Sequence, residues 1–238
     1  MKIAILSDIH SNKYALDAVI HDFEQEGVER IIVLGDIFGY YPWAVETYQA
    51  LKPYLTDAVC ILGNHDLLLL TDSHPPPTPS YWEAARQNKH DLLERENEAL
   101  TWLSTLGLSK TISIQNVQVK FVHGTPGNAE SGRYFPDNTE SQDWFPAQGE
   151  VLLLGHTHYP LFRKVDGGGI IFNPGSVGQP RDGNPMPAWG LWDTTEQSFS
   201  FKRSNYDNLK AMQALEAMHW EQRAIAALNK TNTGKLNF

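Results

Sequence analysis

Five short polar segments, each directly following an apolar run, constrain this chain more than any other feature of its 238 residues. The segments are Asp8-Ile9-His10, Gly35-Asp36, Gly63-Asn64-His65-Asp66, His123-Gly124 and Gly155-His156-Thr157-His158. The short apolar runs before them are typical of buried strands. Ligands of α/β proteins bind beyond strand ends, where exposed turns are held by a rigid scaffold. The repeated placement therefore predicts a ligand site built from several strand ends.

The first quarter of the chain alternates strands with helices. We predict strands at residues 3–6, 31–34 and 58–62. One helix is expected after an N-cap at Ser11 or Asn12, and a second from Pro42 to about residue 54. This β-α-β-α-β order implies parallel strands with helices packed on them.

The remaining chain is predicted to hold a helical insertion followed by strands. The Pro-rich stretch at 72–79 cannot continue a helix, whereas residues 81–106 are helical in pattern. We therefore expect one domain over 1–238, with a helical insertion at about 72–106 and a C-terminal helix at about 208–228. The later strands are predicted at 111–114, 117–122, 151–154, 161–165, 170–172, 189–193 and 199–202.

Composition excludes several classes of protein. The formal charge of −9 and the isoelectric point near 5.4 argue against binding of bulk nucleic acid or an acidic membrane. Cys60 is the only cysteine, which excludes an intramolecular disulfide framework and a thiolate cluster, and its apolar neighbours predict an inert buried thiol. No apolar run is long enough to span a bilayer, so we expect a cytoplasmic protein.

Each polar residue has an ordinary structural explanation when it is taken alone. Asp8 and Asp36 suit turns, Asn64 readily adopts a left-handed conformation, and a lone His123 is more often hydrogen-bonded than a ligand. Chance placement at five strand ends is much harder to explain. The donors are nitrogen and oxygen only, which suits Mn, Fe, Zn, Co or Ni.

The ordered set D-x-H, G-D, G-N-H-D, H-G and G-H-T-H resembles the calcineurin-like metallophosphoesterase superfamily. The resemblance implies an α/β (α+β) fold, a four-layer αββα sandwich in which two mixed β-sheets pack face to face between helices. The segment N-P-G-S at 173–176 is similar to the small bacterial and archaeal phosphodiesterase branch.

The resemblance also implies a ligand set for two divalent ions. Asp8, His10 and His158 match the ligands of one metal, and Asn64, His123 and His156 match those of the other, with Asp36 bridging both. We expect Mn²⁺, with Fe, Zn, Ni or Co as alternatives. The implied reaction is hydrolysis of a phosphodiester, or of a small phosphomonoester or nucleotide, by in-line attack of a metal-bridging hydroxide.

Four further residues are assigned roles around the metals. By resemblance His65 faces the phosphate and either stabilises the transition state or protonates the leaving oxygen, and Asp66 orients its ring. The alternative for Asp66 is a turn-capping carboxylate. Arg181 is a candidate for phosphate binding, and Tyr41, where relatives often have glycine, either crowds or lines the pocket.

Several alternatives stay open at this point. The same fold also supports a non-catalytic metal-binding scaffold, whereas protein phosphatase activity is disfavoured because the Arg of the second motif and G-N-H-E are missing. Residues 72–106 form either a lid over the metals or a surface helix or subunit contact of a homo-oligomer. The expected partner is a small phosphate ester, and no motif identifies which one.

Overall fold

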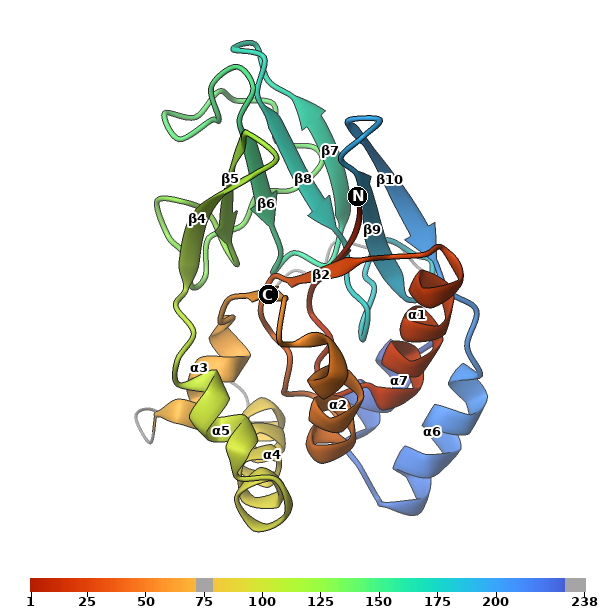
Figure 1. Ribbon diagram of the computed structural model, residues 1–238. Helices are drawn as coiled ribbons and strands as arrows, with labels where there is room; N and C mark the ends of the chain where they lie inside the picture. Colours follow the sequence, from red (N-terminus) through yellow and green to blue (C-terminus); the bar gives the residue numbers. More distant parts are fainter. Residues whose placement is uncertain (72–78, 230–238) are drawn as a thin grey trace.

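The computed structural model describes residues 1–71 and 79–229, and its strands form two five-stranded sheets (Figure 1). The first sheet has the order β10 (Ser198–Arg203), β9 (Ala188–Asp193), β1 (Lys2–Leu6), β2 (Arg30–Val33) and β3 (Val59–Cys60). The second has the order β4 (Ser109–Ile114), β5 (Val117–Val122), β6 (Val151–Leu154), β8 (Ile170–Pro174) and β7 (Pro160–Lys164). Three parallel strands lie side by side in each sheet, β1-β2-β3 and β5-β6-β8, with antiparallel strands beside them. The predicted pair of mixed sheets is confirmed.

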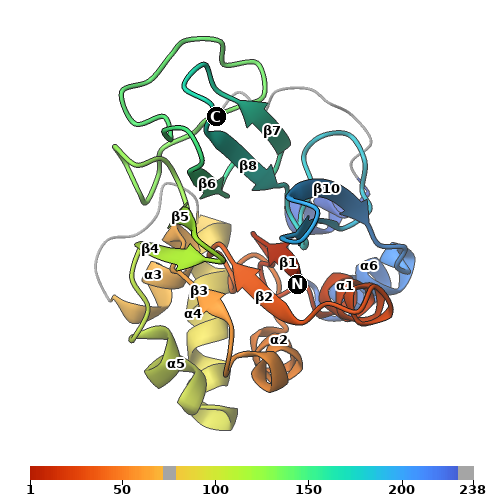
Figure 2. The same cartoon turned by 45° about the horizontal axis from the view of Figure 1, so that its top comes forward.

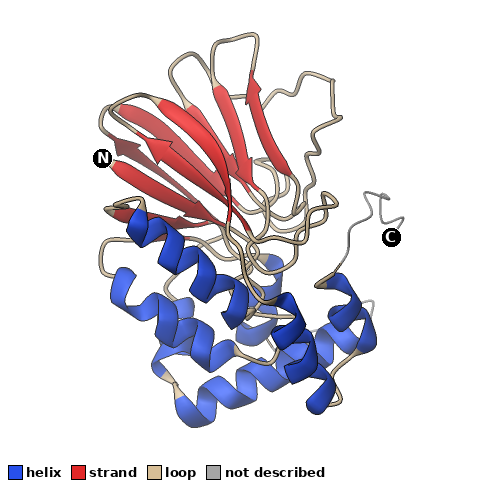
Figure 3. Ribbon diagram, turned by 90° about the vertical axis from the view of Figure 1, so that its right-hand side faces the viewer, coloured by secondary structure: helices blue, strands red, loops and turns tan. Residues whose placement is uncertain are grey.

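The helices gather on one side of the two sheets (Figure 3). They are α1 (Lys13–Gln25), α2 (Ala44–Leu51), α3 (Asn64–Leu70), α4 (Pro79–Arg95), α5 (Glu98–Leu103), α6 (Asn208–Ala217) and α7 (Gln222–Ala227), with a 3-10 turn η1 at Lys52–Tyr54. Asn12 caps α1 by accepting a hydrogen bond from the amide of Ala15. Pro42 lies two residues before α2 rather than inside it, and the expected C-terminal helix is two helices separated by a turn. Sequence patterns also missed the short helix α3.

Alternating side chains of the first sheet divide the core into two layers. Ile3 and Ile5 of β1 pack against the second sheet, in one cluster with Phe121 of β5 and Leu153 of β6. Ala4, the residue between the two isoleucines, faces the opposite way and packs against the helices. This alternation follows from the two-residue period of a strand. It fixes one face of the first sheet against the second sheet and the other against α1 to α5.

The outer face of the second sheet is covered differently. Its apolar side chains pack against Tyr134, Trp144 and Phe145, which belong to the long segment between β5 and β6 (Figure 2). Arg163 of β7 holds this segment by donating to the Tyr134 hydroxyl and to the carbonyls of Pro136 and Asn138. Among the described residues, the fourth layer is therefore an irregular segment, where the resemblance implied helices. Within residues 1–71 and 79–229, no helix has the length and apolarity needed to cross a bilayer.

Candidate metal centre

Seven buried side chains, six from four loops and one from the start of α3, meet at one cluster. Their potential ligand atoms fall into three overlapping groups in which the atoms lie within 4.8 Å of one another. The groups are Asp8, His10 and His158; His10, Asp36 and His65; and Asp36, His123 and His156. Because His10 and Asp36 are shared, the groups form one continuous set of nitrogen and oxygen donors. Six of the seven predicted ligands belong to it.

Asp36 lies at the middle of this cluster. Its Oδ2 is 3.3 Å from Nε2 of His123, 3.7 Å from Nε2 of His10 and 4.0 Å from Nε2 of His65. Its Oδ1 accepts a hydrogen bond of 2.8 Å from the amide of His65. One oxygen is therefore held by the protein, and the other points between the histidines.

Asp8 is held in the same manner. Its Oδ2 accepts hydrogen bonds from the hydroxyl of Ser7 at 2.6 Å and from the amide of His156 at 3.1 Å. Its Oδ1 lies 3.2 Å from Nε2 of His158. Ser7, which the motifs did not single out, therefore orients a candidate ligand.

Backbone carbonyls fix the orientation of two histidine rings. Nδ1 of His123 donates to the carbonyl of Leu34 at 2.7 Å, and Nδ1 of His158 donates to that of Gln179 at 2.6 Å. These bonds place the proton on Nδ1 and leave the lone pair of Nε2 for an ion. Nε2 of His156 is buried and has no hydrogen-bond partner among the described residues. Such a donor set fits divalent transition metals.

Electrostatics keep most of the histidines neutral, as metal ligands must be. Burial, reinforced by neighbouring histidines, lowers the pKa of His10 and His65 well below the usual value. Burial and His123 lower the pKa of His156 to about 3. For His123, burial is outweighed by Asp36 and Asp8, which raise its pKa to about 10.

Asn64, the seventh predicted ligand, begins α3 beside this cluster. The residue is half-buried and lies between Gly63 and His65. A Cβ added to Gly63 would lie 2.1 Å from Oδ1 of Asp36, so the loops after β2 and β3 are in direct contact. Only a residue without a side chain allows this approach.

The segment at 173–181 supports the metal loops from behind. The hydroxyl of Ser176 donates to the carbonyl of Asp8 at 2.8 Å, and the amide of Gly178 donates to the same oxygen at 3.0 Å. The side chain of Asn173 donates to the carbonyl of Gly155 at 2.8 Å. This segment therefore holds the loops after β1 and β6 in fixed positions relative to each other.

Asp66 is buried in the first turn of α3. Its two carboxylate oxygens accept hydrogen bonds of 3.0 Å from the amides of Phe38 and Gly63. Burial and Asp36 raise its pKa to about 7, against the effect of these amides. Asp66 caps α3 and joins it to the loop after β2, which is the turn-capping alternative considered above.

The side chain of Tyr41 is fully buried in a cluster with residues of α6 and α7. The ring packs against Trp43 and against residues of α6 and α7. Its hydroxyl donates to the carbonyl of Ala224 at 3.3 Å. The ring of the preceding residue, Tyr40, lies against two histidines of the cluster. Its ring centroid lies 4.6 Å from that of His10 and 4.5 Å from that of His65.

Arg181 lies beside the same residues. Its Nη2 donates to the side-chain oxygen of Gln179 at 3.0 Å and to the Tyr40 hydroxyl at 3.4 Å. The positive charge also contributes to the lowered pKa of His10 and His158. A permanent positive charge therefore lies at one side of the cluster.

Comparisons with known proteins agree with this geometry. A family model described as a calcineurin-like phosphoesterase superfamily domain matches residues 1–197. An uncharacterized protein of Methanocaldococcus jannaschii is 31% identical over 228 residues, covering 90% of this chain and 91% of that protein. The phosphodiesterase YfcE of Escherichia coli K12 is 27% identical over 203 residues, covering 81% of this chain and 88% of that protein.

A solved structure shares the fold. The crystal structure of a hypothetical protein from Pyrococcus horikoshii superimposes with a TM-score of 0.83 at 23% identity, covering 98% of this chain and 99% of that chain. Since the family model covers most of the sequence and the relatives align along nearly its whole length, this chain belongs to the calcineurin-like phosphoesterase superfamily and fits its small bacterial and archaeal branch.

Proposed function

We propose that this protein is a phosphodiesterase that uses two divalent metal ions. One observation carries the proposal: the buried donor groups on the two sides of Asp36 are continuous through that single carboxylate. A shared carboxylate is what two like-charged ions at a separation of about 3.5–4 Å require. Small phosphomonoesters and nucleotides are the second class of substrate that the same centre suits.

Two sets of residues would hold the ions. Asp8, His10 and His158 suit one ion, and Asn64, His123 and His156 suit the other, with Asp36 common to both. Mn²⁺ is the proposed metal, with Fe, Zn, Ni or Co as alternatives, since a set of nitrogen and oxygen donors suits these ions and selection among them depends on availability. When bound, such ions supply Lewis acidity toward phosphate oxygens and lower the pKa of water toward neutrality.

Two side chains of the protein would act on the phosphate. His65 is buried at the edge of the cluster, with Nε2 4.0 Å from Oδ2 of Asp36. A neutral imidazole there donates one N–H to a phosphate oxygen or to the leaving oxygen. Arg181 adds a permanent positive charge on the Tyr40 side, where charge developing on the phosphate is stabilised.

The proposed preference for diesters over monoesters rests on similarity to a relative. The Escherichia coli relative is named a phosphodiesterase and aligns with 81% of this chain. The cluster by itself does not distinguish a diester from a monoester, because both present the same phosphate oxygens to the metals and to His65. A substrate panel tests this preference.

A metal-reconstituted activity screen tests the proposal. Protein stripped with a chelator and reloaded with Mn²⁺ is assayed with bis-aryl and mono-aryl phosphates, cyclic nucleotides and nucleoside di- and triphosphates. The expected result is a higher kcat/KM on the bis-aryl phosphate than on the mono-aryl phosphate. We expect His65→Ala to lower the rate by about 10²–10⁴-fold. His90→Ala, which changes an exposed histidine of α4, is expected to leave it unchanged.

Two outcomes contradict the proposal in different ways. A preference for monoesters would reject the diester assignment while keeping the phosphoesterase. Tight Mn²⁺ binding without turnover above the His65→Ala control on any substrate would reject catalysis and favour the scaffold alternative.

A further inference from the structure

Three consecutive residues of the loop after β2 are held by side chains from two distant parts of the chain. The amide of Gly39 donates to Oδ1 of Asn88, and Nδ2 of Asn88 donates to the carbonyl of Tyr41, both at 2.8 Å. The indole N–H of Trp220 donates to the carbonyl of Tyr40, also at 2.8 Å. Asn88 lies on α4, and Trp220 lies in the turn between α6 and α7.

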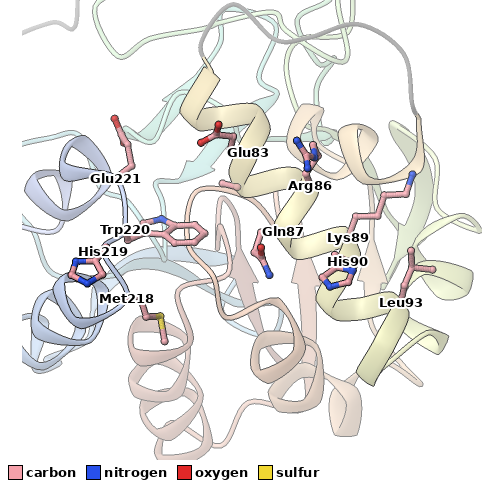
Figure 4. Close-up of a pocket in the computed structure, with 11 residues that line it drawn as sticks. Glu83, Arg86, Gln87, Lys89, His90, Leu93, Met218, His219, Trp220 and Glu221 are labelled. Atoms are coloured by element: carbon pink, nitrogen blue, oxygen red, sulfur yellow. The ribbon is translucent and has the colours of Figure 1, made fainter.

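The two elements that supply these side chains face each other across a pocket of about 810 Å³. Figure 4 shows Trp220 on one wall of this pocket and Gln87, the neighbour of Asn88 on α4, on the other. The loop that carries Tyr40 is therefore held from both sides by outer helical elements. Neither element contributes a candidate metal ligand.

Asn88 also connects this loop to a second one. Its Oδ1 accepts a hydrogen bond of 2.8 Å from the hydroxyl of Ser11, the residue that follows His10. The side chain is fully buried, so each of its three hydrogen bonds replaces one that water would otherwise make. This amide adds to the backbone hydrogen bonds between the loops after β1 and β2, among them those from the amides of Ser11 and Tyr41 to the carbonyls of Ile37 and His10.

The backbone of this loop requires such support. Tyr40 has a φ of 40° and Gly39 a φ of 108°. A non-glycine residue in the left-handed region is unfavourable unless its surroundings impose the conformation. Hydrogen bonds on both sides of Tyr40 meet this requirement.

The conformation determines where the ring of Tyr40 lies. The ring packs on His10, a candidate ligand, and on His65, the candidate catalytic histidine. Its hydroxyl accepts the hydrogen bond from Arg181. Movement of residues 39–41 would therefore shift one wall of the centre, whereas His123 and His156 lie on the loops after β5 and β6.

We propose that Asn88 and Trp220 are positioning residues that hold Tyr40 as a wall of the substrate site. There the ring of Tyr40 contacts the ester group that stays on the phosphorus. The inference rests on the proposed phosphoesterase function. It assigns the insertion and the C-terminal helices a part in substrate selection that they exert through Tyr40. Asp36 lies at the start of the same loop but is held separately, by hydrogen bonds from the amides of His65 and His10, so the effect falls on KM for bulky esters.

A double-mutant cycle with Trp220→Phe and Tyr40→Ala tests the proposal. Trp220→Phe keeps an aromatic side chain, removes the N–H donor and reduces the ring volume, and the last of these effects is matched in the Trp189→Phe control. Loss of a hydrogen bond of ordinary strength predicts an increase in KM for a bis-aryl phosphate of about fivefold, with kcat changed less than about twofold. In the Tyr40→Ala background, Trp220→Phe is expected to have no further effect on KM.

Matched controls separate positioning from general damage. Trp189→Phe likewise removes a buried indole N–H, which donates to Ser204 at 3.0 Å in the strand core, and is expected to leave KM unchanged. Asn88→Asp keeps the acceptor for Gly39 and Ser11 but removes the donor to Tyr41, so it is expected to raise KM. Its control, Asn208→Asp, removes an amide donor to the carbonyl of Leu228 and is expected to leave KM unchanged.

Hydrogen exchange of the amides at 38–43 provides a readout that does not depend on activity. We expect faster exchange in Trp220→Phe and Asn88→Asp, and wild-type exchange in the two controls. Unchanged exchange overturns the proposal even for an inactive protein, whereas absent turnover with faster exchange rejects only the part that concerns substrate. An equal effect of Trp220→Phe on KM with and without the Tyr40 ring also overturns it.

Discussion

At the scale of single residues, the candidate ligands share an uncommon backbone conformation. Asp8, His10, Asp36, His156 and His158 all have φ between 51° and 64°. For L residues this left-handed region costs about 1–2 kcal/mol. Such conformations persist where the surrounding structure imposes them, and they concentrate at functional sites. The bend they introduce directs each side chain back toward the cluster.

This strain makes a prediction for His156. In metal-free protein, His156→Gly is expected to be more stable than His156→Ala by about 1 kcal/mol, because glycine adopts positive φ without penalty. Urea unfolding in the presence of a chelator measures the difference. At His90, inside α4, the order is expected to reverse by about the same amount. Equal stability of the two His156 variants would show that the backbone there is unstrained.

A second prediction concerns Cys60, namely its reactivity and its effect on stability as the pH changes. Burial and the nearby Asp66 raise the pKa of this thiol to about 12, so the folded protein should resist alkylation at pH 8. Because the folded pKa exceeds that of a free thiol, about 8.5, folding favours the protonated form. The resulting stability is complete below the unfolded pKa and is lost as the pH rises toward the folded value.

Iodoacetamide labelling at increasing urea concentration checks this prediction. Labelling of Cys60 should follow global unfolding. A comparison with Cys60→Ala should show the stability of the wild type falling faster above pH 9. Rapid labelling of the native protein at pH 8 would contradict the buried position of the thiol.

At the scale of elements, the centre depends on a close contact between the loops after β2 and β3. Gly63→Ala would place a methyl group 2.1 Å from the Asp36 carboxylate and 2.4 Å from its backbone nitrogen. We expect a loss of stability of about 1–3 kcal/mol and a loss of Mn²⁺ affinity, measured by urea unfolding and by calorimetry. Gly127→Ala, with open space around its Cβ, is the control. Tight Mn²⁺ binding by Gly63→Ala would reject this role for the contact.

The motif residues could be predicted from the sequence, whereas their supporting contacts could not. Strand ends and polar residues are local patterns, so Asp8, Asp36 and His156 were recognisable beside their apolar runs. The hydrogen bonds of Asp66 depend on how α3 meets the loop after β2, which no local pattern records. Tyr40 and Tyr41 are adjacent and chemically alike, and only the positive φ of Tyr40 decides which ring faces the histidines.

At the scale of the whole molecule, two sheets bring loops from both halves of the chain to one place. Asp8 and Asp36 come from the first sheet, and His123, His156 and His158 from the second. The two-residue alternation of β1 predicted the buried face, but not which sheet would cover it. Nor could composition show that the segment between β5 and β6, rather than a helix, would close the outer side.

The net charge also acts at this scale. A chain with a charge of −9 should not bind duplex DNA, because it gains nothing from the release of counterions. Fluorescence anisotropy with a duplex of about 20 base pairs at 0.15 M salt should show no binding below about 100 µM. Micromolar binding that weakens as salt is added would show a basic surface that the net charge conceals.

The central claim is that Asp36 joins two metal sites in one catalytic centre. Metal content and the rate on a bis-aryl phosphate, measured on the same Mn²⁺-reconstituted samples, test it most directly. Wild-type protein should retain about two ions per chain, and chelation should abolish the rate. Asp36→Asn should retain fewer ions and lose at least about 100-fold in rate, whereas Asp143→Asn, at an exposed carboxylate, should match the wild type. Full activity in the chelated protein, or wild-type metal content and rate in Asp36→Asn, would contradict the account.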